Sequence, residues 1–308
     1  MATETTTPVT APPVHDKPSD SALAAGLDAL ETPIVNPRPS FLSQVWRSAW
    51  PVLSALAALV VVWQIAYVLE LKPPYALPSP ADTWQTFLTA VQDGTAWLAI
   101  STSVRRAAVG FVMSVVIGIA IGTALAASPL LRRAFGPIIT GLQSLPSVAW
   151  VPAAIIWFGL TDATLYAVIL LGAVPSIVNG LLAGTDQVPP LFLRVGQVLG
   201  ARGWTRIRHV LLPAALPGFL GGLKQGWAFA WRSLMAAELI TLAIGGGGLG
   251  QLLETGRSLN DMSLVIVSIF LIFLVGIAVE LIVFSPLERA VLHSRGLTGQ
   301  TSNTGRRR

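Results

Sequence analysis

Long apolar segments separated by short polar stretches dominate the pattern along this chain. Six of them predict helices, at roughly residues 50–70, 104–127, 135–158, 164–184, 218–243 and 264–285. Each segment reaches or approaches the roughly 20 residues that a helix needs to cross a bilayer. The sequence therefore predicts an all-α membrane protein with six transmembrane helices, and six spans place both termini on the same side.

Polar segments flank this apolar region at both ends. Residues 1–44 are rich in Thr, Pro, Ser and Ala and show no sustained apolar period, which predicts a disordered tail. Residues 45–290 contain the six spans, and residues 291–308 form a basic tail. We therefore expect one membrane domain between two polar tails.

Composition and charge support the membrane interpretation and give it an orientation. Of the 308 residues, 53% are hydrophobic and 11% charged, and the net charge is +5. The basic residues lie near the ends of the apolar segments, and most fall on the side that carries both termini and the 185–217 loop. The positive-inside rule makes that side cytoplasmic. We expect a multi-pass protein of the bacterial plasma membrane that contacts lipid and does not bind nucleic acid.

Small residues recur at every fourth position in three of the predicted spans, which places them on one helical face. They are Gly110, Ser114, Gly118, Gly122 and Ala126 in the second span, Gly172, Ser176, Gly180 and Gly184 in the fourth, and Gly218, Gly222, Gly226 and Ala230 in the fifth. Such ridges let helix backbones approach closely in a membrane. We expect spans two to five to form the packed core, and spans one and six to lie nearer lipid.

The segment between the first two spans predicts a short helix on the outer surface. Ser79 is placed as an N-cap, Pro80 at the first helical position and Asp82 in the first turn. Trp84 and Phe87 begin an apolar face at helical spacing. This helix serves either as an interfacial anchor or as a lid over a translocation path.

Three prolines lie inside predicted spans: Pro146 and Pro152 in the third, and Pro175 in the fourth. Each removes a helical hydrogen bond and favours a kink. Such kinks are either packing devices or points at which a gate bends.

Two charges lie inside the fifth span, Arg232 and Glu238. Their spacing separates them by about 240° around a helix, so each needs a partner on another span or on a second copy of the chain. Arg105 and Arg106, at the outer end of the second span, are candidate partners for Glu238. Arg232 and Glu238 either form interhelical pairs or lie in a translocation path, where the Arg232 fork would meet an anion.

The loop at 185–217 carries most of the functional information in the sequence. Nine residues after Gly200 the chain reads Val210-Leu211-Leu212-Pro213. Gly200 permits a left-handed turn between two short helices, and Pro213 and Pro217 are expected to stop a helix where the chain re-enters the membrane. Trp204, Ile207, Val210 and Leu211 form an apolar stripe, which lies either in a partner's groove or against the membrane and its anionic headgroups.

This loop resembles the cytoplasmic coupling loop of type I ABC importer permeases, of which the aliphatic sulfonate, taurine and nitrate group is the most similar. The segments that carry the resemblance, over most of residues 73–285, are the loop, Leu77-Pro78-Ser79-Pro80, Gln143-Ser144-Leu145-Pro146-Ser147-Val148-Ala149-Trp150-Val151-Pro152 with Trp157-Phe158-Gly159, and Ala230-Trp231-Arg232 through Ala236-Ala237-Glu238. The chain departs from the family at Arg194-Val195-Gly196, where the family has Glu-Ala-Ala, so a docking contact through that Glu is in doubt.

The resemblance implies a homodimeric permease that imports a small anion by alternating access, with an ABC ATP-binding subunit and an extracytoplasmic solute-binding protein as partners. The residues it assigns to ATPase docking are Arg194, Gly200, Ala201, Arg202, Trp204, Arg206, Ile207, Leu212 and Pro213.

The sequence contains no P-loop pattern, so ATP and Mg²⁺ are expected to act in the partner subunit, and no cofactor, metal site or catalytic residue is predicted in this chain. The GxGxxG at residues 245–250 follows an apolar span rather than a strand, which favours an external turn over a dinucleotide site. A secondary transporter or channel that works without ATP is the alternative; no internal inverted repeat supports it.

Overall fold

The computed structural model describes residues 41–73, 75–241 and 247–294, and every regular element in these ranges is a helix. Most of both predicted tails lies outside the described residues. Their inner ends do not, since residues 41–44 begin a helix and residues 291–294 end one. The chain divides into two units, Met1–Leu59 and Val60–Arg308.

The first described helix, α2, runs from Phe41 to Val68 and starts earlier than the predicted edge at residue 50. It continues through Pro51, so this proline does not end it. In the second unit, the Trp63 indole Nε1–H donates to the carbonyl of Pro78 at 3.0 Å and ties the end of α2 to the segment before α3.

The predicted outer helix is confirmed as α3, Pro80–Gln92. The Asp82 N–H donates to Ser79 Oγ at 3.0 Å, which is the N-cap expected from the sequence. The Phe87 ring meets Phe270 edge to face, with the ring centroids 5.9 Å apart. Phe270 belongs to α12, Met262–Val279, so α3 packs on this long apolar helix.

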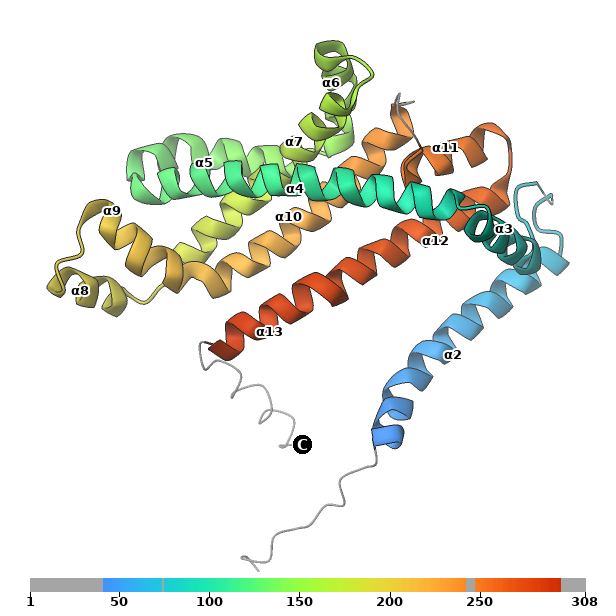
Figure 1. The fold of residues 1–308 in the computed structure, drawn as a ribbon, viewed down its shortest axis with the longest axis horizontal. Helices are drawn as coiled ribbons and strands as arrows, with labels where there is room; N and C mark the ends of the chain where they lie inside the picture. Colours follow the sequence, from blue (N-terminus) through green and yellow to red (C-terminus); the bar gives the residue numbers. More distant parts are fainter. Residues whose placement is uncertain (1–40, 74, 242–246, 295–308) are drawn as a thin grey trace, which may run out of the picture. The chain divides into compact units, whose positions relative to one another are not determined.

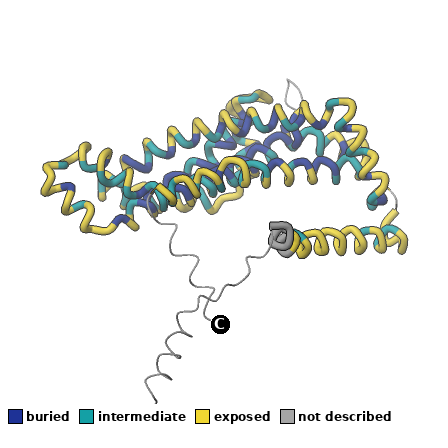
Figure 2. Tube along the Cα trace, turned by 60° about the horizontal axis from the view of Figure 1, so that its bottom comes forward, coloured by how far each residue is buried: buried dark blue, intermediate teal, exposed yellow. Residues whose placement is uncertain are grey.

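Three long helices form the core of the Val60–Arg308 unit. These are α4, Thr95–Ala127, α7, Asp162–Asp186, and α10, Leu212–Ile240. They lie side by side in Figure 1, and their contacting faces are the buried ones in Figure 2. The small-residue ridges are confirmed as the reason for this packing.

The glycines of α4 receive large side chains of α7. A Cβ at Gly118 would stand 2.6 Å from the Ile177 side chain, and one at Gly110 would stand 2.7 Å from Ile169. Between α7 and α10 the backbones themselves touch, because a Cβ at Gly222 would lie 2.4 Å from the Cα of Gly180. No larger residue fits at this crossing without moving a helix.

The third predicted span, 135–158, is wrong as a single helix. It consists of α5, Pro129–Ser144, a 3₁₀ turn η1, Ser147–Trp150, and α6, Val151–Phe158, with a bend of 99° between the two halves. The chain breaks at Pro146, whose ring prevents α5 from continuing, while Pro152 stands in the first turn of α6, where a proline is tolerated.

The expectation that the third span belongs to the packed core is also wrong for α5, which buries none of its residues. The physical reason is the absence of a close partner: a Cβ at Gly136 or Gly141 would meet nothing within 4 Å. The N-terminal end of α5 is held instead by an ion pair between Arg132 and Asp186 at the end of α7.

After α10 and residues 242–246, which are outside the described residues, the chain forms α11, Leu249–Ser258, and then α12. A π-helical turn η3, Glu280–Phe284, connects α12 to α13, Ser285–Ser294.

Among the described residues, four helices are long and apolar enough to cross a membrane, or five if the bent α5–α6 pair is one span. The four are Ala49–Val68, Thr95–Ala127, Asp162–Asp186 and Met262–Ser294. The fifth predicted span, α10, is not among them; it carries Lys224, Arg232 and Glu238.

Candidate functional site

The 185–217 loop folds as a helical hairpin at one end of the core (Figure 1). Its arms are α8, Pro190–Val198, and α9, Gly203–Arg206, which continues into a π-helical turn η2, Ile207–Leu211. The arms touch where a Cβ at Gly196 would stand 2.9 Å from the Val210 side chain. We call residues 190–211 the hairpin.

The turn of the hairpin confirms the expectation for Gly200, whose φ is +85°. The Gly200 N–H donates to the Gln197 carbonyl at 3.0 Å, and the Ala201 N–H donates to the Gly196 carbonyl at 2.8 Å. This pair of bonds is the Schellman motif, in which a left-handed residue ends a helix. A Cβ at Gly200 would meet nothing within 4 Å, so its side faces open space.

The prediction that Pro213 and Pro217 stop the helix is wrong. Arg206, Ile207, Leu211 and Leu212 all have right-handed helical dihedrals, and the chain is helical from α9 through η2 into α10. The π-helical turn explains this, because it widens the backbone just before the proline that lacks an N–H. The helix that enters the hairpin is therefore the same helix that carries Arg232 and Glu238.

The predicted apolar stripe divides between an inner and an outer surface. Ile207 is 9% exposed and Val210 packs on α8, so neither presents its side chain to a partner. Leu212 is half-buried against the core, whereas Trp204 is 62% exposed. Ile207 is thus removed from the expected docking surface.

Other apolar side chains of the hairpin, which the sequence pattern did not single out, are exposed. Val198 and Leu199, beside the Gly200 turn, are 86% and 80% exposed, and Leu191 is exposed as well. The exposure of Val198 and Leu199 follows from the hairpin geometry, since they lie at its tip, whereas Leu191 lies at the start of α8. A helical period counted from Trp204 includes none of the three. An apolar tip of this kind needs a partner surface or lipid.

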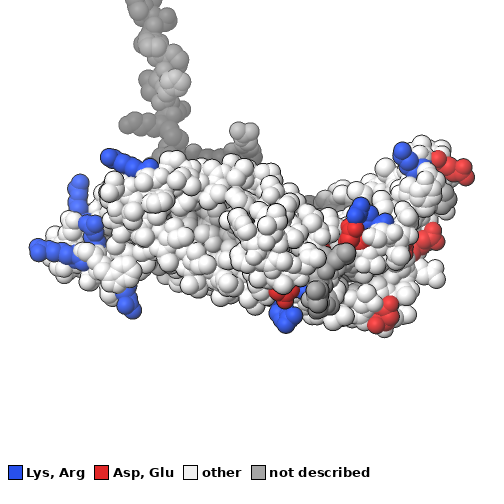
Figure 3. All heavy atoms as spheres, turned by 90° about the horizontal axis from the view of Figure 1, so that it is seen from above, with Lys and Arg blue, Asp and Glu red and all other residues white. Residues whose placement is uncertain are grey.

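Basic residues surround the tip. Arg194, Arg202 and Arg208 are exposed, Arg206 is half-buried, and Ala201 lies in the turn. Figure 3 shows Lys and Arg over the end of the Val60–Arg308 unit that carries the hairpin, and Asp and Glu mixed with Lys and Arg over its other end. At the base of the hairpin, a cavity of about 460 Å³ is lined mostly by apolar residues, among them Phe192, Leu199 and Pro217.

Glu238 is held at the opposite end of α10 by a buried polar cluster. Its Oε1 accepts from Arg106 Nη1 at 3.2 Å and its Oε2 accepts from Ser103 Oγ at 2.7 Å and from the Gly250 N–H at 3.1 Å. The Arg106 Nη2 also pairs with Asp162 Oδ1 at 3.0 Å. The exposed fractions are 1% for Arg106 and 0% for Glu238.

This cluster confirms Arg106 as the partner of Glu238, while the neighbouring Arg105 is exposed and forms no ion pair among the described residues. It also explains part of the glycine run. A Cβ at Gly248 would lie 2.4 Å from both Glu238 oxygens, and one at Gly250 would lie 2.6 Å from the Glu238 Cβ. These glycines admit the carboxylate, whereas Gly245 and Gly246 lie outside the described residues.

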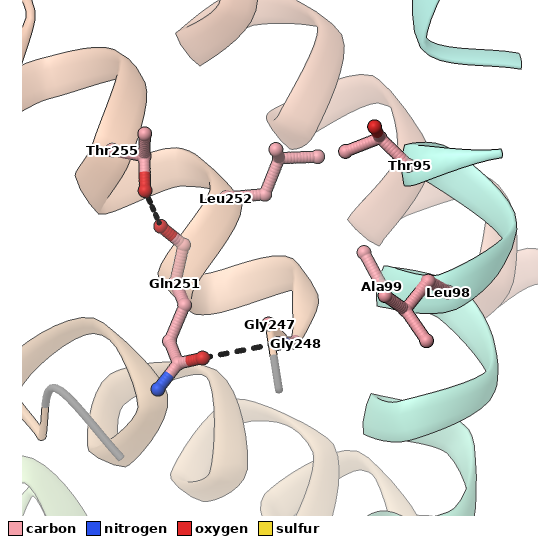
Figure 4. A pocket seen from close by; sticks show the side chains of 8 residues that line it. All are labelled: Thr95, Leu98, Ala99, Gly247, Gly248, Gln251, Leu252 and Thr255. Carbon is pink, nitrogen blue, oxygen red and sulfur yellow. Dashed lines mark hydrogen bonds between the residues drawn. The ribbon is translucent and has the colours of Figure 1, made fainter. Parts of the chain in front are cut away.

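A cavity of about 410 Å³ opens beside this cluster, between the start of α4 and α11 (Figure 4). The Gln251 Oε1 accepts from the Gly248 N–H at 3.3 Å, and the Thr255 Oγ1 donates to the Gln251 carbonyl at 2.9 Å. Its polar lining consists of hydroxyl and amide groups, with no charged side chain among the residues that line it.

Arg232 has a different environment from Glu238, although both lie on α10. It is exposed, its Nε donates to the Ala228 carbonyl at 3.0 Å, and its guanidinium carbon lies 4.8 Å from the centre of the Phe229 ring. It lines a cavity together with Gln143–Val148, the segment in which the third span breaks at Pro146. Pro175, by contrast, is buried within the unbroken helix α7.

The described residues contain no group of three or more His, Asp or Glu side chains arranged to hold a metal ion.

Comparison with known proteins gives consistent results. A model of the family described as binding-protein-dependent transport system inner membrane component matches residues 114–290. The taurine transport system permease protein TauC of Escherichia coli is 31% identical over 248 residues, covering 77% of this chain and 88% of that protein. The nitrate import permease protein NrtB of Synechocystis sp. is 31% identical over 235 residues, covering 73% of this chain and 83% of that protein.

The fold is similar to that of a chain in the inward-facing MetNI methionine ABC transporter. The TM-score is 0.51 at 20% identity, covering 63% of this chain and 96% of that chain.

Proposed function

Because this chain belongs to the family of inner membrane components of binding-protein-dependent transport systems, we propose that it is the permease subunit of an ATP-driven importer for a small anion. It is a multi-pass, all-helical membrane protein of the ABC importer permease type. An aliphatic sulfonate or taurine, or else nitrate, is the proposed cargo. The relatives named for taurine and nitrate support this class.

The permease has six spans in this proposal, with α5–α6 counted as one broken span and α10 as the fifth. The charges of α10 do not exclude it from a membrane, because Glu238 is neutralised inside the protein and Lys224 pairs with Glu280 at 2.7 Å and with Glu288 at 3.1 Å. Both termini and the hairpin lie in the cytoplasm, which the arginines at that end support (Figure 3).

The hairpin docks into the ATP-binding subunit, and this is the central element of the mechanism. The observation that carries it is an exposed apolar tip, Val198, Leu199 and Trp204, ringed by arginines and joined without a helical break to α10. An apolar patch with a polar rim has the composition of a protein interface. Arg194 stands where the related loops have a Glu, so basic side chains replace the expected acidic contact.

The importer works as two copies of this chain with two ATP-binding subunits, which use ATP and Mg²⁺, and an external binding protein delivers the anion. Closure of the ATPase pair moves the hairpins and alternates access between the two sides, so this subunit itself catalyses no reaction. The alternative is a secondary transporter or channel, which needs no ATP-binding partner and leaves the exposed tip of the hairpin without a function.

The test uses the left-handed turn. Asp and Asn both tolerate the backbone of Gly200 better than other residues do, and neither meets a neighbour there. Gly200→Asp places a negative charge at the tip, whereas Gly200→Asn is its uncharged match. We expect the native chain and Gly200→Asn to co-purify with an ATP-binding subunit from native membranes, and Gly200→Asp to lose that subunit while it remains folded.

Transport by reconstituted protein supplies the second measurement. ATP-dependent uptake should be lost in Gly200→Asp and retained in Gly200→Asn. A native chain that purifies alone and moves solute without ATP, or normal uptake by Gly200→Asp, would contradict the proposal.

A further inference from the structure

The break in the third span and Arg232 enclose a common cavity of about 370 Å³. It is lined by Gln143–Val148, Phe229 and Arg232, and we call it the Arg232 cavity. Small-molecule sites have volumes of about 300–1,000 Å³, so it is large enough for a small ligand. It lies away from the hairpin residues and from the Glu238 cluster, since it shares no lining residue with either.

Arg232 differs from Arg106 and Lys224 in its lack of a carboxylate partner, a lack that it shares with the exposed Arg105 of α4. Arg106 pairs with Glu238 and Asp162, and Lys224 pairs with two glutamates. Within the described residues Arg232 forms no ion pair. Its one hydrogen bond there runs from Nε to the carbonyl of Ala228. An unpaired charge at membrane depth faces water or a binding partner, because lipid does not solvate it.

The broken helix supports the same assignment. Irregular backbone at membrane depth is tolerated where it is buried in protein or lines a water-filled cavity. Leu145 and Pro146 are exposed at the break, beside Arg232. Discontinuous helices form the substrate sites of many transporters.

A second donor lies in the same cavity. Gln143 Oε1 accepts from Asn179 Nδ2, which fixes the amide and leaves its Nε2 hydrogens as donors. The N–H groups on Nη1 and Nη2 of Arg232 have no acceptor among the described residues, and their fork geometry suits an oxyanion. The rest of the lining consists of Ser144 and Ser147 and of the apolar Leu145, Pro146, Val148 and Phe229.

We propose that the Arg232 cavity is a binding site for an organic monoanion in transit, with its oxyanion head on the Arg232 fork and its short apolar tail against Leu145, Val148 and Phe229. The lining has one cation and no carboxylate, so its charge matches a monoanion without an ammonium group. An alkylsulfonate fits this description better than nitrate, which has no tail. The inference rests on the proposed import function and names the ligand class of its path.

The first experiment measures protection of Arg232 from phenylglyoxal, an arginine reagent, in the full-length protein with its ATP-binding subunit in lipid nanodiscs. Labelling is followed at each arginine by peptide mass spectrometry. Ethanesulfonate at ten times its Kd should slow labelling of Arg232 about tenfold, because mass action leaves about one tenth of the sites free. Neutral ethanesulfonamide should not slow it, and Arg105, exposed on α4, should be unaffected.

Unchanged labelling of Arg232 with ethanesulfonate would overturn the site. Equal slowing at Arg105 would do the same, because it would mean a general effect of the anion. If nitrate protected Arg232 from labelling at a lower concentration than ethanesulfonate does, the proposal that the ligand has an apolar tail would be contradicted.

The second experiment separates this inference from the proposed function. Arg232→Gln should abolish uptake of ethanesulfonate in proteoliposomes while the ATP-binding subunit still co-purifies, Arg232→Lys should retain part of the uptake with a raised KM, and Arg105→Gln should be normal. Normal uptake by Arg232→Gln in an intact complex would contradict the proposed binding site but would not contradict the proposed import function. Protection of Arg232 in a chain that never binds an ATP-binding subunit would overturn the importer instead.

Discussion

Glu238 remains buried because neighbours from two other helices, α4 and α11, reach its carboxylate. Arg106 supplies the charge, Ser103 and the Gly250 N–H supply hydrogen bonds, and Gly248 supplies the space. Buried ion pairs are weak evidence for stability as such, but removal of one member strands the other. At the scale of the residue, Glu238 therefore joins α10 to α4 and α11, and Arg106 extends the cluster to Asp162 on α7.

Glu238→Ala should destabilise the protein by about 3–5 kcal/mol, because Arg106 loses its buried partner. The measurement is unfolding of the purified protein in a denaturing-detergent titration. The double variant Glu238→Ala/Arg106→Met should be less destabilised than the sum of the two single variants, since no cation is then left stranded. Additive losses would show that the two side chains do not interact.

The crossing of α7 and α10 shows how a helix face determines packing at the scale of the element. Gly222 contacts the backbone of Gly180, whereas the adjacent Gly221 on the other face has no neighbour within 4 Å of a Cβ. Gly222 therefore permits a close contact between the two helices, whereas Gly221 only lowers the helix propensity of α10.

Alanine at these two positions should change stability in opposite directions. Gly222→Ala should destabilise the protein by about 1–3 kcal/mol through overpacking. Gly221→Ala should stabilise it by about 0.5–1 kcal/mol, because the unfolded chain loses freedom. The same detergent titration measures both changes in stability. An equal effect of the two variants would contradict the close contact of α7 and α10 at Gly222.

Sequence spacing predicted those features that depend on neighbours along the chain. The cap at Ser79, the left-handed turn at Gly200 and the small-residue ridges are of this kind. The break at Pro146 was missed, because apolar residues continue on both sides of it and hydropathy does not register a bend. The continuous helix through Pro213 was missed because a π-helical turn leaves no periodic signal.

The partner of Glu238 was predicted only as one of two adjacent arginines. Charges are rare in these spans, so the pairing itself could be anticipated. Consecutive residues on a helix point about 100° apart, and only the packing of α4 on α7 decides that Arg106 faces inward and Arg105 outward.

At the scale of the whole molecule, the face of the Val60–Arg308 unit in Figure 3 shows only basic charges at the hairpin end and carboxylates mixed with basic side chains at the other end. Asp93, between α3 and α4, belongs to the second group, and the pKa of its carboxyl lies below the usual value because the Thr95 N–H donates to it. It therefore stays charged in mildly acid surroundings, as suits a residue that the proposed topology places on the outer surface.

Orientation can be tested with single cysteines, since the native chain has none. In intact spheroplasts a membrane-impermeant maleimide should label Asp93→Cys, and it should label Val198→Cys only after permeabilisation. The reverse pattern would invert the proposed topology. Equal labelling of both before permeabilisation would mean that the membrane was not sealed, which a cytoplasmic marker protein excludes independently.

The helical backbone continues from Gly203 to Ile240 and bends between α9 and α10 (Figure 1), so a movement of the hairpin would be passed directly to α10. At 1.5 Å per residue, the 29 residues of α10 span roughly 44 Å, and a tilt of about 5° would displace one end by about 4 Å relative to the other. With the Glu238 cluster as the fixed end, the hairpin end would move by this amount, whereas Arg232, six residues from Glu238 and roughly 9 Å along the axis, would move by less than about 1 Å. A movement of the hairpin would therefore reach Arg232 as a small shift of its guanidinium relative to the break at Pro146.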